Sequence, residues 1–117
     1  MIRKSPSEHS LQVQVIDYLY MAGKNGAFAI ACANAGKRSM FTGRRMVAEG
    51  LTAGVADLCV LLPGGHVGWL EMKTASGRQS IAQKGFAARC LRLNHPYAVA
   101  RSLDEAVKIL KLWGAVR

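Results

Sequence analysis

No apolar run in this sequence approaches the ~20 residues that a membrane-spanning helix requires. The basic residues near the amino terminus are not followed by the apolar segment of a signal peptide. Only three cysteines occur, and no two form a Cys-x-x-Cys pair, so neither a disulfide framework nor a cysteine-based zinc site is expected. We therefore expect a protein of the cytoplasm that contacts no membrane.

Acidic residues are scarce as well. The chain has 7 Asp and Glu against 16 Lys and Arg, which leaves a formal net charge of +9. Up to Leu58 there are 7 basic and 4 acidic residues, and after it there are 9 and 3, so the excess is spread along the chain. A basic surface of this kind favours a polyanionic partner, and nucleic acid is the partner we expect. The alternative is that the positive charge only keeps the protein soluble.

Two common catalytic motifs are missing. The sequence has no glycine-rich phosphate-binding loop, since Pro63-Gly64-Gly65 is typical of a hairpin turn, and no motif supports a Ser-His-Asp hydrolase. Hydrophobic residues make up 50% of the 117 residues, which is enough for one packed domain spanning residues 1–117.

Hydrophobic periodicity and capping signals predict an α/β fold with one mixed β-sheet flanked by helices. The motif Ser5-Pro6-Ser7-Glu8 is typical of a helix start, with Ser5 as the cap and Glu8 completing a capping box. The run Leu58–Leu62 is continuously apolar, so we expect a central strand that is buried on both faces. The predicted helices span residues 5–23, 42–49, 78–93 and 102–114, and the predicted strands span 27–33, 58–62, 66–73 and 97–100.

The strands on either side of the Pro63-Gly64-Gly65 turn bring two acids together. With Leu62 paired to His66, Asp57 lies directly opposite Glu71. Opposed side chains on neighbouring strands have Cβ atoms ~5 Å apart, and two carboxylates at that distance repel each other. A divalent cation removes this repulsion, and Mg²⁺ prefers carboxylate oxygens, with a main-chain carbonyl available to complete its shell. The hairpin therefore predicts a magnesium site.

Lys73 lies two residues after Glu71, so both side chains share one face of the strand. An ammonium group beside a metal ion can orient or deprotonate an attacking water, or stabilise charge on a phosphate. Together with Asp57, these residues outline a site for phosphodiester hydrolysis. The alternative is an ordinary hairpin whose Asp, Glu and Lys are exposed at its open end. A shift of the pairing by one residue would remove the geometry.

Four segments of the chain follow a family pattern: Ser7-Glu8-His9-Ser10-Leu11-Gln12, Glu49-Gly50-Leu51-Thr52-Ala53-Gly54-Val55-Ala56-Asp57-Leu58, Glu71-Met72-Lys73 and Ser80-Ile81-Ala82-Gln83. In their order and spacing they resemble the virus-type replication-repair nuclease (VRR-NUC) family of the PD-(D/E)xK superfamily, over nearly the whole chain. The resemblance implies a restriction-endonuclease-like core of helix, three strands, helix and strand, with Lys73 as the motif's lysine. One departure is that the family's Pro-Asp reads Ala56-Asp57 here. Proline shapes the chain that enters the strand and is not a ligand, so the change concerns loop rigidity more than chemistry.

The resemblance also implies which residues form the site. Asp57 and Glu71 would bind Mg²⁺ or Mn²⁺, with the main-chain carbonyl of Met72 as a third ligand. Glu8 would match an acidic residue on the first helix that reaches the ion, through a bound water molecule. Gln83 would match a catalytic glutamine on the helix after the lysine strand.

Small members of this family are associated with dimers and branched DNA. The resemblance therefore implies a homodimer that cleaves structures such as four-way junctions, of phage origin and acting in the cytoplasm of a bacterial host. Lys and Arg side chains supply salt-dependent affinity for phosphates. Asn34, Lys37 and Arg38 form a polar loop after the first strand, and this loop is expected either to contact phosphates or to be simply solvated. The candidate nucleic-acid-binding residues are Asn34, Lys37, Arg38, Arg44, Arg45 and Lys84.

The leading hypothesis is thus a Mg²⁺- or Mn²⁺-dependent endonuclease that hydrolyses phosphodiester bonds in DNA. The alternative is a non-catalytic DNA-binding module that uses the same basic surface, for which the complete set of Asp57, Glu71 and Lys73 is not required. A nuclease that acts on RNA is a third possibility, since none of these residues distinguishes the two nucleic acids.

Overall fold

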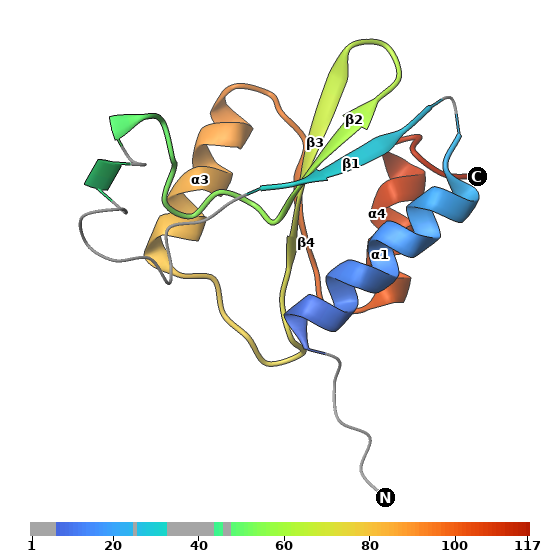
Figure 1. The fold of residues 1–117 in the computed structure, drawn as a ribbon, viewed down its shortest axis with the longest axis horizontal. Helices are drawn as coiled ribbons and strands as arrows, with labels where there is room; N and C mark the ends of the chain where they lie inside the picture. Colours follow the sequence, from blue (N-terminus) through green and yellow to red (C-terminus); the bar gives the residue numbers. More distant parts are fainter. Residues whose placement is uncertain (1–6, 25, 33–43, 46–47) are drawn as a thin grey trace, which may run out of the picture.

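The computed structural model describes residues 7–24, 26–32, 44–45 and 48–117. It has the predicted order of elements, with four strands in one sheet and a helix at each predicted position of the core (Figure 1). The elements are α1 (Glu8–Ala22), β1 (Phe28–Ala31), β2 (Leu58–Leu62), β3 (His66–Met72), α3 (Ile81–Arg92), β4 (Tyr97–Ala100) and α4 (Leu103–Leu112).

The start of α1 differs from the prediction. Ser7, not Ser5, caps the helix, because its backbone is extended and its hydroxyl accepts a hydrogen bond from the Ser10 N–H at 3.0 Å. Glu8 is therefore the first helical residue, and the predicted cap Ser5 lies outside the described residues. The helix ends at Gly23, as predicted. This start leaves the Glu8 carboxylate available for other contacts.

The sheet has the strand order β1-β2-β3-β4 and is mixed, as predicted. The pairs β1–β2 and β2–β3 are antiparallel, whereas β3–β4 is parallel. The hairpin register is confirmed, with Leu62 opposite His66 and Leu58 opposite Leu70. The same register, continued by one residue, brings Asp57 to Glu71. The parallel pairing places Tyr97 beside Trp69, which no sequence pattern indicated.

The two faces of the sheet are covered unequally. Helices α1 and α4 lie on one face and α3 lies on the other (Figure 1). Leu58, Val60, Leu70 and Met72 point toward α1 and α4 and are fully buried in the main core. The alternate residues of β2 are half-buried or exposed, so the prediction of a strand buried on both faces is wrong. Among the elements that the structure describes, the short helix α3 is the one that lies over the second face.

Helix α3 is shorter at both ends than the predicted 78–93. It begins after Ser80, where the Ser80 hydroxyl accepts from the Gln83 N–H and the Gln83 Oε1 accepts from the Ser80 N–H. This reciprocal capping box fixes the start of the helix, so residues 78 and 79 remain non-helical. Of the predicted helix over 42–49, Arg44 and Arg45 are helical, and part of the rest lies outside the described residues.

Two observations concern the cysteines and the length of the helices. The three cysteines are free thiols. Among the described residues, no helix combines the length and apolar character needed to cross a membrane.

Candidate metal and phosphodiester site

Asp57 is held in place at the entrance to β2 by contacts on both sides. Its main-chain carbonyl accepts a hydrogen bond from the Cys32 N–H at 2.8 Å, which extends the β1–β2 pairing. Its Oδ2 accepts from the Met72 N–H at 2.7 Å. The Asp57 carboxylate therefore lies against the main chain of β3, beside Glu71, as the hairpin register predicts.

Glu71 is a buried acidic residue of β3. Its side chain is only 1% exposed, although it carries a carboxyl group. Burial raises the pKa of Glu71 to about 7, and the nearby Asp57 and Glu8 carboxylates raise it too, against the lowering effect of Lys73 and of a hydrogen bond from Tyr97. The acid thus sits where a negative charge is poorly compensated in the protein alone.

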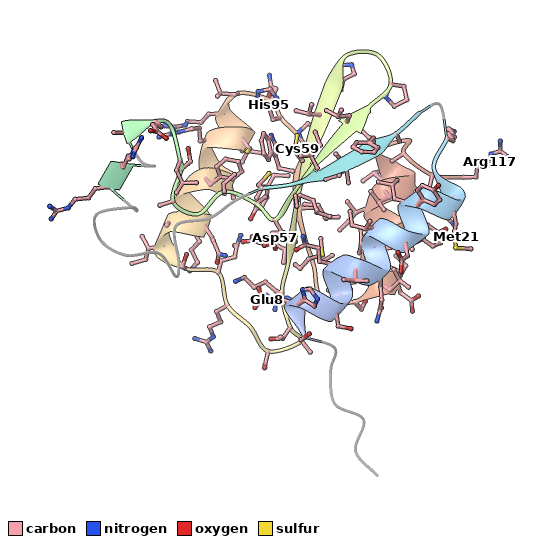
Figure 2. The ribbon with its side chains drawn as sticks, viewed as in Figure 1. Glu8, Met21, Asp57, Cys59, His95 and Arg117 are labelled. Atoms are coloured by element: carbon pink, nitrogen blue, oxygen red, sulfur yellow. The ribbon has the colours of Figure 1, made fainter. Side chains whose placement is uncertain are left out.

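Lys73 follows β3 and is only 7% exposed. Its N–H donates to the Ala100 carbonyl at 3.0 Å, so the β3–β4 pairing extends to the lysine. Its Nζ lies 3.9 Å from Oε1 of Glu8, the first residue of α1. Figure 2 shows Glu8 and Asp57 at the same end of the sheet. The alternative of an ordinary hairpin with an exposed Asp, Glu and Lys at its open end is therefore wrong, because Glu71 and Lys73 are buried.

Two further residues, Tyr97 and Gln79, complete this cluster. The Tyr97 hydroxyl donates to Glu71 Oε2 at 3.5 Å, and Gln79 Nε2 donates to the Tyr97 oxygen at 2.8 Å. Gln79 stands one residue before the cap of α3. No periodicity in the sequence points to Tyr97, because its position depends on the parallel register of β3 and β4.

Gln83 has a structural role in addition to the catalytic role that the resemblance implies. Its Oε1 and its N–H are both engaged in the capping box with Ser80. The side-chain amide nitrogen is not used by that box. A catalytic role for Gln83 stays a prediction.

The candidate nucleic-acid-binding residues have different outcomes. Arg44, Arg45 and Lys84 are exposed, as such a surface requires. Arg45 also forms an ion pair with Glu49 at 3.3 Å, one helical turn away and in solvent. The predicted contacts Asn34, Lys37 and Arg38 lie outside the described residues.

The donor set fits a hard divalent cation. Asp57 and Glu71 supply carboxylate oxygens on adjacent strands, and the main chain of Met72 lies against Asp57. Positive charge placed there would offset the uncompensated carboxylate of Glu71. Among the residues the structure describes, no three His, Cys, Asp or Glu side chains gather as a metal cluster, so a site here relies on two acids and the main chain.

Comparisons with known proteins support the fold. No protein-family model and no curated protein matches the chain. A solved structure described as a "VRR_NUC domain protein" superposes with a TM-score of 0.77, covering 95% of this chain and 90% of its own, at 16% sequence identity. A second, described as a "VRR_NUC domain", has a TM-score of 0.64, covering 91% and 97%, also at 16% identity. The chain therefore has the VRR-NUC fold, which is restriction-endonuclease-like, and the predicted fold class is confirmed.

Proposed function

We propose that this protein is a Mg²⁺- or Mn²⁺-dependent nuclease that hydrolyses phosphodiester bonds in DNA. The observation that carries the proposal is the buried Glu71 carboxyl beside Asp57, with the Lys73 ammonium next to it. Binding of DNA alone does not require a buried acid beside a second carboxylate and an ammonium group. The VRR-NUC fold of the chain supports the same activity.

Each residue of the cluster has a distinct task. Asp57, Glu71 and the Met72 carbonyl would hold the cation, which, when bound, polarises the scissile phosphate and lowers the pKa of a water molecule. Lys73 supplies a fixed positive charge that stabilises negative charge on the phosphate. The Glu8 carboxylate forms an ion pair with the Lys73 ammonium at 3.9 Å, which keeps the ammonium at this end of the sheet.

The proposed substrate follows from charge. The net charge of +9 favours a polyanion such as nucleic acid, and exposed Lys and Arg side chains give affinity without base recognition. Selectivity for four-way junctions and a homodimer rest on the family resemblance alone. A surface for a second copy is available where Tyr20 of α1 and Phe28 of β1 line a common apolar hollow on the edge of the sheet.

Cleavage by matched variants tests the proposal. Plasmid, flapped, four-way and single-stranded RNA substrates are incubated with Mn²⁺ and wild type, Asp57→Asn, Lys73→Met or Asp17→Asn. Asp57→Asn keeps an oxygen for the Met72 N–H but removes the charge, and Asp17 is an exposed acid of α1 that serves as the control. We expect at least ~100-fold slower cleavage by Asp57→Asn and Lys73→Met, with Asp17→Asn at the wild-type rate.

Other outcomes discriminate the alternatives. Equal cleavage by all four proteins would refute the assignment of the site. DNA binding by wild type without cleavage in Mg²⁺ or Mn²⁺ would favour the non-catalytic module. Faster cleavage of RNA than of every DNA substrate would redirect the proposal to RNA, and light scattering on the purified protein decides whether it is a dimer.

A further inference from the structure

We propose that Gln79 and Tyr97 form a hydrogen-bonded relay that orients the Glu71 carboxylate for cation binding, so that both are positioning residues of the site. The inference rests on the proposed function, which assigns Glu71 as a ligand. Neither residue belongs to the segments that carry the family resemblance. What brings them together is the packing of α3 and β4 against β3.

When Glu71 is ionised, as a cation ligand must be, the donors and acceptors of the relay admit one arrangement. An ionised carboxylate only accepts hydrogen bonds, so the single proton of the Tyr97 hydroxyl points to Glu71 Oε2. The Tyr97 oxygen is then left as an acceptor, and it accepts from Gln79 Nε2 at 2.8 Å. A donor on the oxygen side of a hydroxyl polarises its O–H bond and strengthens the bond it donates. Gln79 therefore acts on Glu71 through Tyr97.

The tyrosine ring is fixed independently of its hydroxyl. Phe86 of α3 packs edge-on against both Tyr97 and Trp69, with ring centroids 6.1 Å and 5.2 Å apart. Trp69 and Tyr97 are neighbours across the parallel β3–β4 pair. Removal of the hydroxyl alone should leave this aromatic cluster in place, which makes Tyr97→Phe a clean test.

Orientation of Glu71 matters because its two oxygens have different neighbours. Oε2 accepts from the Tyr97 hydroxyl, so Oε1 is the oxygen that this bond does not hold, and we assign it to the cation. Partners that orient a metal ligand in this way typically contribute ~10-fold or more to metal affinity. We therefore expect disruption of the relay to weaken cation binding, in addition to any effect on cleavage.

Calorimetric titration with Mn²⁺ compares wild type, Tyr97→Phe, Gln79→Met and the double variant. We expect about 10-fold weaker binding by Tyr97→Phe, a smaller loss by Gln79→Met, and a double variant no weaker than Tyr97→Phe alone. Asp17→Asn, which removes the charge of an exposed acid on α1, should bind like wild type. Unchanged affinity of Tyr97→Phe, or additive losses in the double variant, would overturn the relay.

A second readout needs no metal. In the metal-free proteins, the Glu71 side-chain ¹³C resonance should shift in Tyr97→Phe and, less, in Gln79→Met, with no further shift in the double variant. An unshifted resonance in Tyr97→Phe would overturn the relay. If wild type binds no Mn²⁺, or binds it as well after Glu71→Gln, the proposed function fails while the carbon resonance still decides the relay.

Discussion

Glu71 and Lys73 lie two residues apart on one strand face, yet their environments act on them differently. Burial disfavours the charged form of the acid, and its nearest neighbours include two more carboxylates. The lysine, by contrast, has the Glu8 carboxylate at 3.9 Å as a counter-charge. The cluster therefore has a surplus of negative charge at Glu71, and either a proton or a cation relieves it.

The pH dependence of stability follows from this surplus. The pKa of Glu71 is about 7 in the folded protein, above the ordinary value of 4.5 for a glutamate. A raised pKa means that the folded protein binds the proton more tightly, so the contribution of Glu71 is present at low pH and is lost as pH rises toward 7. We expect the metal-free protein to lose about 2 kcal/mol of unfolding free energy from this group between pH 5 and pH 8. Urea unfolding at the two pH values measures it.

Glu71→Gln is the control for that measurement, because glutamine does not titrate. The difference in pH dependence between wild type and Glu71→Gln isolates the contribution of the acid from that of every other group. Mn²⁺ should raise the stability of wild type more at pH 8 than at pH 5, since the ion competes with the proton. Identical pH profiles for the two proteins would contradict the account.

At the scale of elements, the start of α3 matters both for the stability of the helix and for the position of the candidate site. The helix begins at Ser80 because two side chains satisfy the free N–H groups there. The loop before β2 lies against the same turn, since a Cβ added to Gly54 would be 2.2 Å from the main-chain carbonyl of Ala82. The loop that leads to Asp57 is thus held against the start of α3 by main-chain packing.

Comparison of Ser80→Ala with Gln83→Ala separates the two roles of Gln83. Each variant removes one half of the capping box, so both should lose about 1 kcal/mol of unfolding free energy. Only Gln83→Ala also removes an amide that would face the substrate. We expect it to cleave at least ~10-fold more slowly than Ser80→Ala under conditions where both are folded. Equal rates would restrict Gln83 to the cap.

Gly54→Ala and Gly65→Ala test the close approach of the loop to α3. The two glycines have almost the same φ, 78° and 79°, so alanine is strained equally at both. Only Gly54 has main-chain atoms within contact of an added Cβ, whereas Gly65 has nothing within 4 Å. We expect Gly54→Ala to lose at least ~1 kcal/mol more than Gly65→Ala in thermal unfolding. Equal losses would show that the loop yields without cost.

For the whole molecule, the positions of the exposed lysines would determine the side from which DNA approaches the candidate site. Glu71 stands between Leu70 and Met72, which face α1 and α4, so its side chain lies on the face of the sheet that α3 covers. Lys84 is exposed on α3, and Lys108 is exposed on α4 on the opposite side. A phosphate backbone that reaches Glu71 should pass Lys84 and should miss Lys108.

Salt dependence of DNA binding tests this direction of approach. The affinity is measured without divalent ions as a function of salt, so that no cleavage interferes. Each phosphate contact contributes about one unit to the slope of log affinity against log salt. We expect Lys84→Gln to reduce the slope by about one and Lys108→Gln to leave it unchanged. The reverse result would place DNA on the α4 face.

Sequence patterns alone determined the order of elements, the hairpin register and the pairing of Asp57 with Glu71. These properties depend on residues close in the chain, where alternation and turn chemistry leave few choices. The cap at Ser7 and the shorter α3 were not predicted correctly, because several residues there are capable of capping and only the packed chain selects one.

The tertiary structure decided the contacts between segments that are distant in the sequence, which local patterns do not encode. The parallel contact of β3 with β4 brings Tyr97 to Glu71, and the docking of α3 brings Gln79 to Tyr97. It also decided that one face of β2 stays partly exposed, since within the described ranges this face is covered by α3 alone. Burial is a property of the assembled molecule, so the raised pKa of Glu71 arises only when distant segments remove water from a carboxyl group that the sequence had already placed.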